Sequence, residues 1–241
     1  MLAGKRVLVT AAAGTGIGFA TARRCVEEGA TVFISDQHER RLAESASTLG
    51  VSSVPCDVTV EAQVQRMFDS AVSELGGLDV VVNNAGLGGT APIVDMTDDQ
   101  WNVVLDVTLN GTFRCTRAAM RHMVPRGSGV IVNNASVLGW RAQAGQAHYA
   151  AAKAGVMALT RCAAIEAAGS GVRINAVAPS LALHPFLEKV TTPELLAELE
   201  QREAFGRAAE PWEVANVIVF LASDYSSYMT GEVVSVSSQH P

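Results

Sequence analysis

Residues 6–36 read RVLVTAAAGTGIGFATARRCVEEGATVFISD, and this stretch decides the fold. A β-branched run over 6–10 leads into a glycine-bearing turn, a helical stretch over 16–30 that closes at Gly29, and a second β-branched run over 31–36. Such runs are typical of strands, and glycine after a helical pattern is a common stop signal. The order strand, turn, helix, strand predicts a βαβ unit with two parallel strands.

The same alternation continues along the chain. Further strands are expected at 52–58, 78–86, 129–136, 172–179 and 231–237, and further helices at 39–50, 61–77, 97–124, 148–169 and 210–223. Thr97 is the expected N-cap of the helix over 97–124. Apolar strands between helices predict an α/β fold with a doubly wound parallel sheet (Rossmann topology) in a single domain, 1–241. The stretch 180–209 interrupts the alternation, and we expect it to hold an extra helix pair that forms a substrate lid.

Composition excludes several classes of protein. The chain has 241 residues, of which 49% are hydrophobic and 17% charged, so it has enough apolar residues for one sizeable core. Its net charge of -6 argues against a nucleic-acid partner. No apolar run reaches the ~18 residues of a membrane span, and no signal peptide precedes the first strand. The four cysteines (25, 56, 115 and 162) form no metal-binding pattern, so we expect a cytoplasmic protein with reduced thiols and no metal site.

The turn after the first strand has the features of a phosphate-binding loop. TAAAGTGIG (10–18) follows a strand and opens a helix, so its backbone is expected to approach a dinucleotide pyrophosphate at the positive helix terminus. Asp36 ends the second strand, where a carboxylate can bind both ribose hydroxyls and repel a 2′-phosphate, which favours NAD. Arg40 and Arg41 nearby leave NADP open. Asp57, after the third strand, is expected to bind the adenine amine or to cap a helix.

The stretch YAAAK (149–153) places a phenol and an ammonium four residues apart. Residues at this spacing share a helix face, and the alanines between them favour a helix. A free phenol has a pKa of about 10, and a neighbouring ammonium lowers that pKa because it favours the phenolate. The pattern predicts Tyr149 as a proton-transfer group beside Lys153, although these five residues alone also fit a solvated surface helix.

Taken together, these stretches resemble the short-chain dehydrogenase/reductase family over nearly the whole chain. The turn 10–18, CDVT (56–59), LDVVVNNAG (78–86), Ser136, YAAAK and RINAVAP (173–179) occur in the family's order and spacing. The resemblance implies hydride transfer between a nicotinamide cofactor and a secondary alcohol or ketone. It implies that Tyr149 is the general acid/base, that Lys153 also holds the nicotinamide ribose, and that Ser136 binds the substrate oxygen.

The cofactor contacts implied by the resemblance lie at the ends of the strands. They are Thr10, Gly14, Gly16, Ile17, Gly18, Asp36, Asp57, Val58, Asn83, Asn84, Ala85, Gly86, Tyr149, Lys153, Pro179 and Ala182.

Three departures from the family pattern affect this site. Ala11–Ala13 stand where a first glycine is usual, so we expect a different path for the turn because a Cβ disfavours positive φ. Thr108 occupies the place of the family's catalytic helix asparagine, whereas Asn110 should face elsewhere. We therefore include Thr108 in the catalytic set, although its hydroxyl cannot reproduce an amide in the family's proton relay. In PSLALH (179–184), Ser180 replaces a glycine and His184 replaces a threonine that contacts the carboxamide.

The stretch between Ser136 and Tyr149 is expected to shape the substrate pocket. We predict substrate contacts from Leu138, Trp140, Gln146 and His184, with Trp140 packing at a subunit interface as the alternative. The substrate is expected to be a bulky ketone or alcohol, by resemblance a bicyclic steroid-breakdown intermediate (a hydroxy-indanone propanoate or its CoA thioester). Lys189, Arg202 and Arg207 are candidate contacts for CoA phosphates.

Two other functions remain open from the sequence. A 3-oxoacyl-[acyl-carrier-protein] or 3-oxoacyl-CoA reductase shares the same core residues, and a catalytically silent dinucleotide sensor would keep the same fold. By resemblance we also expect a homotetramer that associates through the Tyr149-bearing helix and the last strand.

Overall fold

The computed structural model describes residues 1–183 and 192–238 and confirms the predicted architecture. Within them lies a sheet of seven strands in the order β3-β2-β1-β4-β5-β6-β7, with every neighbouring pair parallel. The strands are β1 (Arg6–Thr10), β2 (Thr31–Asp36), β3 (Ser52–Pro55), β4 (Val80–Asn83), β5 (Gly129–Asn134), β6 (Val172–Pro179) and β7 (Val233–Val236). The strand order reverses direction between β1 and β4, and ligands of such folds bind at that switch point.

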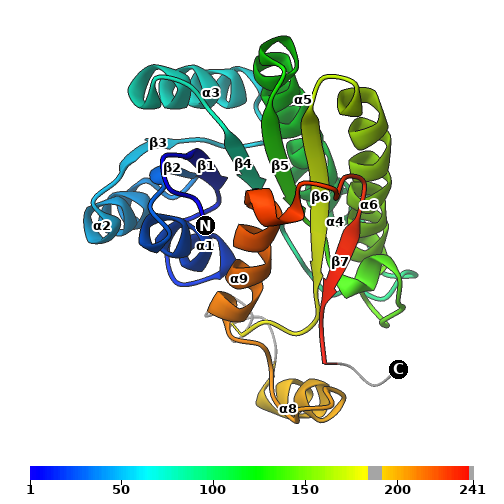
Figure 1. Ribbon diagram of the computed structural model, residues 1–241. Helices are drawn as coiled ribbons and strands as arrows, with labels where there is room; N and C mark the ends of the chain where they lie inside the picture. Colours follow the sequence, from blue (N-terminus) through cyan, green and yellow to red (C-terminus); the bar gives the residue numbers. More distant parts are fainter. Residues whose placement is uncertain (184–191, 239–241) are drawn as a thin grey trace.

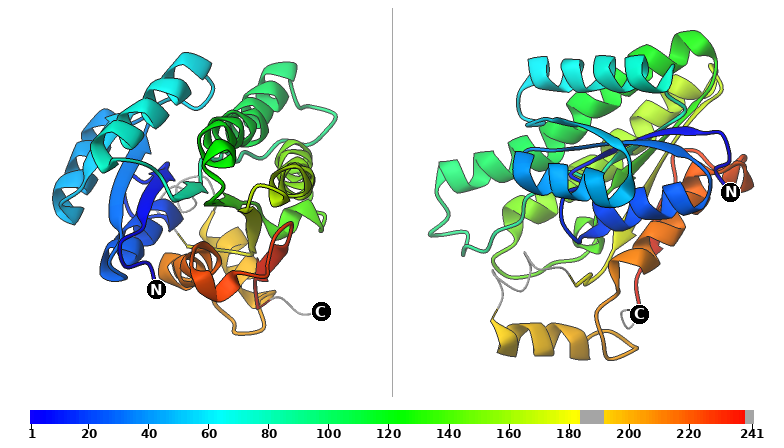
Figure 2. Two further views of the ribbon diagram at one scale, coloured as in Figure 1. Left: turned by 45° about the horizontal axis from the view of Figure 1, so that its top comes forward. Right: turned by 90° about the vertical axis from the view of Figure 1, so that its left-hand side faces the viewer.

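Helices cover both faces of the sheet (Figures 1 and 2). The first face carries α1 (Ile17–Glu27), α2 (Glu39–Leu49) and α9 (Pro211–Ala222), and the other carries α3 (Glu61–Leu75), α4 (Asp98–Leu105), α5 (Gly111–Met123) and α6 (Ala147–Ala168). Alternate residues of β1 point to opposite sides: Val7 and Val9 pack into the core under α1 and α9, and Leu8 packs into the core under α3 and α5.

The helix predicted over 97–124 is not continuous. Thr97 caps α4 as expected, because it accepts a hydrogen bond from the Gln100 N–H (3.2 Å) while Gln100 Oε1 accepts one from the Thr97 N–H (2.9 Å). Residues Asp106–Asn110 then form a π-helical turn, η1, before α5, and a 3-10 turn, η2 (Val124–Arg126), follows α5. A π-turn holds one extra residue, which an apolar pattern of helical period does not reveal.

Buried asparagines join β4 and β5 inside the core on the side of α5 and α6. Asn83 donates to Asn133 Oδ1 (2.9 Å) and to Thr116 of α5 (3.2 Å), and Asn133 donates to Thr160 of α6 (2.9 Å). Asn83 and Asn133 are also register partners across the two strands. This polar cluster ties two strands to two helices where the surrounding residues are apolar.

The described part of the chain between β6 and α9, residues 180–183 and 192–210, lies below the carboxyl end of the sheet (Figure 1 and the right view of Figure 2). It contains α8 (Pro193–Gln201), which Thr192 caps by accepting from the Leu195 N–H (3.2 Å). Ala182 and Ala209 form a bridge that holds the two ends of this segment together. The helix pair predicted for TTPELLAELEQREAF (191–205) is a single helix, α8, within the described residues 192–205, and residues 184–191 lie outside the described structure. No helix among the described residues is long and apolar enough to cross a membrane.

Candidate active site

A cavity of about 1140 Å³ opens at the carboxyl ends of the strands. Pockets for drug-sized ligands measure ~300–1,000 Å³, so this cavity has room for a larger ligand such as a dinucleotide. It is lined by most of the predicted site residues: Thr10, Gly14, Gly16, Ile17, Gly18, Asp36, Asp57, Val58, Asn84, Ala85, Gly86, Ser136, Leu138, Gln146, Tyr149, Lys153, Pro179 and Ala182. Asn83, Thr108 and Trp140 do not line it, and His184 lies outside the described residues.

The glycine turn takes an unusual path at its first alanine. Ala11 has φ +51°, the left-handed region that costs a residue with a Cβ about 1 kcal/mol, and it is the single non-glycine residue with positive φ in the described structure. The different path expected for this turn therefore takes the form of a strained backbone at Ala11. Gly14 also has positive φ (+91°), and its N–H donates to Ser45 Oγ of α2 (3.0 Å).

The start of α1 is open to an anion. Gly16, its N-cap residue, has no side chain to bind the first N–H groups, which therefore remain available to a ligand. At Gly18 a Cβ would lie 2.3 Å from the Ala11 carbonyl oxygen and 2.5 Å from Asn84 Nδ2, so only glycine lets the turn pack this closely against the helix. These features fit the pyrophosphate of a dinucleotide.

The carboxylate of Asp36 is already hydrogen bonded within the turn region. Its two oxygens accept from the N–H groups of Ala13 (3.1 Å) and His38 (2.9 Å), and each keeps a lone pair for a ribose hydroxyl. Arg41 lines the same cavity, whereas the exposed Arg40 lies 3.9 Å from Glu44.

Asp57 lines the cavity and closes a local turn. Its Oδ1 accepts from the Thr59 N–H (2.9 Å) and from the Thr59 hydroxyl (2.8 Å). The alternative of a helix N-cap is wrong, because Val60 is the N-cap residue of α3 and no side chain caps that helix. An adenine contact by Asp57 stays a prediction.

Tyr149, Lys153 and Ser136 meet at the centre of the cavity. YAAAK forms the first turns of α6, and Lys153 Nζ lies 5.5 Å from the centre of the Tyr149 ring. Nζ donates to the backbone oxygen of Asn134 (2.5 Å) at the end of β5. Ser136, just beyond β5, is hydrogen bonded to the Tyr149 side chain and accepts from the Leu138 N–H (3.2 Å). The three side chains that the sequence selected are thus brought together by β5 and α6.

The predicted lowering of the Tyr149 pKa is wrong for this arrangement. Burial raises the pKa of Tyr149 to about 12, and the hydrogen bond with Ser136 offsets this only in part. Burial also lowers the pKa of Lys153 to about 7. Removal from water favours the neutral form of each group. Tyr149 is therefore held protonated over the neutral pH range.

Thr108 supports a loop. Its hydroxyl donates to the Leu87 carbonyl (3.2 Å) and accepts from the Leu87 N–H (3.0 Å), which fixes the chain just after β4. Asn110 faces away, as expected, and donates to Asp106 (3.1 Å). The Thr108 hydroxyl makes both of these hydrogen bonds with the Leu87 backbone, and a role for Thr108 in proton transfer stays a prediction.

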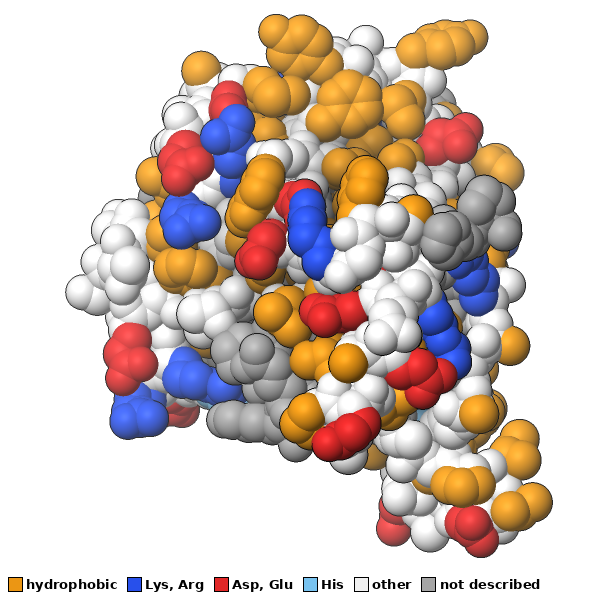
Figure 3. Space-filling model, turned by 90° about the horizontal axis from the view of Figure 1, so that it is seen from below, with side chains coloured by type: hydrophobic (Ala, Val, Ile, Leu, Met, Phe, Trp, Pro, Cys, Tyr) orange, Lys and Arg blue, Asp and Glu red, His pale blue; other side chains and the backbone are white. Residues whose placement is uncertain are grey.

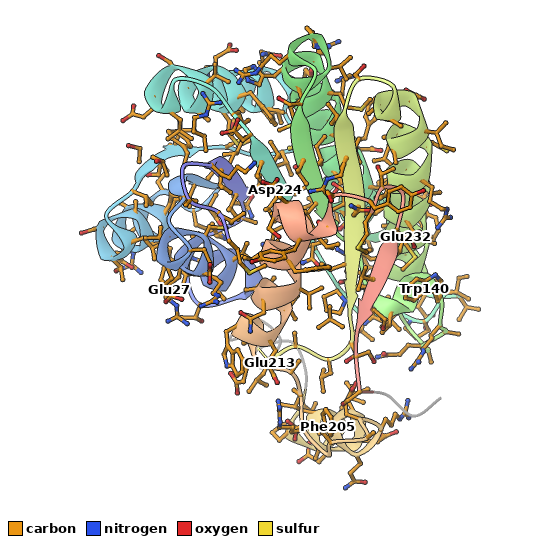
Figure 4. All side chains as sticks on the ribbon, viewed as in Figure 1. Glu27, Trp140, Phe205, Glu213, Asp224 and Glu232 are labelled. Atoms are coloured by element: carbon orange, nitrogen blue, oxygen red, sulfur yellow. The ribbon has the colours of Figure 1, made fainter. Side chains whose placement is uncertain are left out.

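The substrate side of the cavity has fewer internal bonds. Gln146 donates to Thr90 (3.0 Å) from the loop after β4. Trp140 is 52% exposed and Phe205, beyond α8, is 76% exposed, and both lie on the outer edge of the fold (Figure 4). Arg202 and Arg207 are paired with Glu198 and Glu213, so the two predicted CoA-phosphate contacts within the described residues already have acidic partners. Seen from below, basic and acidic side chains are interspersed on this end of the molecule (Figure 3).

Asn134 and Glu203 are among the cavity residues that the sequence analysis did not predict. Asn134 lines the cavity and donates to Asn84 Oδ1 (2.9 Å). Glu203, which is 3% exposed, accepts from Ser180 (3.0 Å) and Ser238 (3.1 Å) and so joins the segment after α8 to the ends of β6 and β7. The doubled asparagines of NNAG (83–86) and NNAS (133–136) are a sequence signal from which the bond between Asn84 and Asn134 could have been predicted. No local pattern marks Glu203.

No group of three or more His, Cys, Asp or Glu side chains within residues 1–183 and 192–238 is arranged to hold a metal ion.

A family model described as "Enoyl-(Acyl carrier protein) reductase" matches residues 11–238. A solved structure described as a short chain dehydrogenase from Mycobacterium smegmatis superposes with a TM-score of 0.88 at 60% identity, over 100% of this chain and 94% of the other. The chain belongs to the short-chain dehydrogenase/reductase family.

Curated relatives show which short-chain dehydrogenases/reductases this chain is similar to. The (5R,7aS)-5-hydroxy-7a-methyl-1-oxo-2,3,5,6,7,7a-hexahydro-1H-indene-carboxyl-CoA reductase of Mycobacterium tuberculosis is 66% identical over 249 residues, which span 100% of this chain and 95% of the relative. A 3-oxoacyl-[acyl-carrier-protein] reductase of Thermotoga maritima is 41% identical, over 98% of this chain and 97% of the relative. The chain is an oxidoreductase acting on CH–OH groups, as short-chain dehydrogenases/reductases are.

Proposed function

We propose that this chain interconverts a ring ketone and its secondary alcohol on a bicyclic hydroxy-methyl-oxo-hexahydroindene carboxyl-CoA, with NAD(H) as cofactor. The observation that carries the proposal is the 66% identity to the indene-carboxyl-CoA reductase over the entire chain. The relative with 3-oxoacyl-[acyl-carrier-protein] reductase activity is more distant, at 41% identity.

A nicotinamide dinucleotide fits the residues of the cavity. The open N-terminus of α1 and the glycines at 14, 16 and 18 suit its pyrophosphate, and the free lone pairs of Asp36 suit the adenosine ribose. A carboxylate at that position repels a 2′-phosphate, which supports NAD over NADP. Arg41, which also lines the cavity, is a basic side chain that would favour NADP.

The chain's own residues handle the proton. The cofactor, when bound, supplies or accepts the hydride at the substrate carbon. In reduction, the Tyr149 hydroxyl gives its proton to the substrate oxygen, to which Ser136 donates a hydrogen bond; in oxidation the proton returns to Tyr149. Burial raises the pKa of Tyr149, so the phenol holds the proton that reduction of a ketone requires. Lys153 is anchored on the Asn134 backbone oxygen, with its Nζ 5.5 Å from the centre of the Tyr149 ring.

A substrate panel tests the proposal. Purified protein is assayed with NADH and NADPH against the bicyclic ketone as CoA thioester, the same ketone as free acid, and acetoacetyl-CoA. We expect kcat/KM for the bicyclic thioester with NADH to exceed the other combinations by at least about tenfold, which corresponds to ~1.4 kcal/mol. Preference for acetoacetyl thioester with NADPH would instead identify a 3-oxoacyl reductase. Dinucleotide binding without turnover of any ketone would identify a silent sensor.

We further propose a cytoplasmic homotetramer. Large apolar side chains are exposed on one side of the fold, with Val103 of α4 48%, Phe113 of α5 42% and Ile165 of α6 80% accessible. Burial of such side chains between copies of the chain would stabilise an oligomer. Light scattering of the purified protein should give four times the chain mass of 25.3 kDa, and a monomeric mass would refute the assembly.

A further inference from the structure

A run of hydrogen bonds crosses the switch point of the sheet from the glycine turn to Lys153. Asn84 Nδ2 donates to the Ala11 carbonyl (3.0 Å), and Asn134 Nδ2 donates to Asn84 Oδ1 (2.9 Å). The Asn134 backbone oxygen in turn accepts from Lys153 Nζ (2.5 Å). Asn134 is therefore linked to the dinucleotide turn through Asn84 and is bonded directly to the catalytic helix through its backbone oxygen.

The direction of each bond in this run is fixed by Ala11. A carbonyl oxygen only accepts, so Asn84 must turn Nδ2 toward it and Oδ1 away. Asn134 supplies that donor, so the Asn84 amide is held at both ends, by the Ala11 carbonyl and by Asn134. If Asn134 lost its donor, the bond to the Ala11 carbonyl would be the one side-chain hydrogen bond left to Asn84 among those the described residues show.

The Ala11 carbonyl is the part of the turn that most needs this support. Ala11 sits at φ +51°, a conformation that alanine leaves when it is not held there. Its oxygen lies close against the start of α1, because a Cβ built on Gly18 would come within 2.3 Å of it. The geometry of the dinucleotide turn thus depends on a side chain that belongs to β5.

We propose that Asn134 is a positioning residue that holds the Ala11 turn in its ligand-binding form through Asn84, and that it compensates for alanine in place of glycine at position 11. The inference rests on the proposed nicotinamide site. Asn134 itself does not touch the reacting atoms in this account. Its backbone bond to Lys153 is independent of its side chain, so loss of the amide should affect dinucleotide affinity and leave the chemical step nearly unchanged.

A double-mutant cycle tests the compensation. Asn134→Leu removes the donor at similar volume, and Ala11→Gly removes the backbone strain. We expect the Kd for NADH, from quenching of protein fluorescence, to rise about 5- to 20-fold in Asn134→Leu, while kcat at saturating NADH and ketone stays within about twofold. Ala11→Gly alone should change the Kd by less than about threefold. In the Asn134→Leu background it should recover at least half of the lost affinity on a logarithmic scale, because a glycine holds positive φ without help.

Other outcomes would overturn the inference. Unchanged NADH affinity in Asn134→Leu would show that the amide does not position the turn, and failure of Ala11→Gly to restore affinity would remove the compensation. Asn134→Thr, which suits the end of a strand but is too short to reach Asn84, replaces the leucine variant if that variant does not fold. If the unsubstituted protein itself does not bind NADH, the proposed function is wrong. If the variants bind NADH as tightly as the unsubstituted protein does, the role given to Asn134 is wrong and the proposed function stands.

Discussion

The two halves of the cavity are built differently. Hydrogen bonds between strand ends hold the dinucleotide half, which lies at β1, β2, β4 and β5. The substrate half consists of a loop (138–146) and of one helix with its flanking residues (192–209). On the first side, Thr10, Asn84 and Asn134 are all at least partly buried and bonded to one another's strands. On the second side, Trp140 and Phe205 are mostly exposed, and Glu203 provides the main buried link to the sheet.

This difference follows from what each half has to bind. A dinucleotide turn must keep the same geometry for one invariant ligand, and a sheet edge provides that rigidity. A substrate wall can differ between related enzymes when it is built from connecting segments on a common scaffold. Substitutions in the two halves should therefore change different measured quantities, and Tyr149 lies where both halves meet.

The largest effect is expected from Tyr149→Phe, which removes the proton donor at the junction of the two halves. General acid/base groups contribute 10²- to 10⁴-fold to rates, so we expect kcat to fall about 10³-fold with little change in NADH affinity. Steady-state kinetics and NADH titration measure the two quantities. Retention of more than a tenth of the activity would mean that another group transfers the proton.

Lys153→Met should stabilise the fold at neutral pH, because Lys153 is buried. Its pKa falls from 10.5 in the unfolded chain to about 7 in the folded protein, so folding favours the neutral amine. Stability contributed by this group is lost as pH falls from 10.5 toward 7 and is constant below that. The shift corresponds to an advantage of about 2–5 kcal/mol for the methionine variant at pH 7 and below.

Urea unfolding of both proteins at several pH values measures this advantage. The difference in unfolding free energy between Lys153→Met and the original chain should shrink as pH rises toward 10.5. Other groups that titrate in this range, such as the buried cysteines, are present in both proteins and cancel in the difference. An equal difference at every pH would show that Lys153 keeps its proton in the folded state.

In the substrate half, Glu203→Ala should weaken the attachment of the α8 segment to the sheet. Loss of the bonds from Ser180 and Ser238 is expected to raise KM for the ketone by up to about tenfold and to cost about 1–2 kcal/mol of stability. The Kd for NADH should stay within about twofold, which distinguishes this variant from Asn134→Leu. If both ligands weaken equally, the two halves are not independent.

Thr108→Asn should have the smallest effect on activity, within about tenfold or ~1.4 kcal/mol. An asparagine at this position restores the family's residue but must replace both bonds of Thr108 to Leu87. A loss of kcat as large as that of Tyr149→Phe would mean that the hydroxyl of Thr108 takes part in proton transfer.

The dinucleotide half could be predicted from sequence because its residues follow directly on strands. Gly18, Asp36 and Ser136 are each placed by counting from a β-branched run, and the carboxyl ends of parallel strands meet at one edge. The pairing of Asn84 with Asn134 depends on strand order, which a linear pattern does not contain. The positive φ of Ala11 was hidden because alanine is an unusual residue for that conformation.

The substrate half and the electrostatics were harder to predict. Glu203 is buried through contacts 23 and 35 residues away in sequence, with Ser180 and Ser238, and no local periodicity carries such information. The pKa of Tyr149 was assigned the wrong direction because spacing on a helix shows a nearby charge but not the loss of water around both groups. The π-turn before α5 was missed for a related reason, since one inserted residue leaves the apolar pattern almost intact.

The Asn83–Asn133 pair in the core has a consequence for how the chain folds. Side chains alternate between the two faces of a strand, so sliding β5 by one position against β4 would separate Asn133 from Asn83 and turn it to the opposite face. Its buried amide would then lack partners, at a cost of several kcal/mol. The pair therefore favours the native alignment of β4 and β5 over one shifted by a residue.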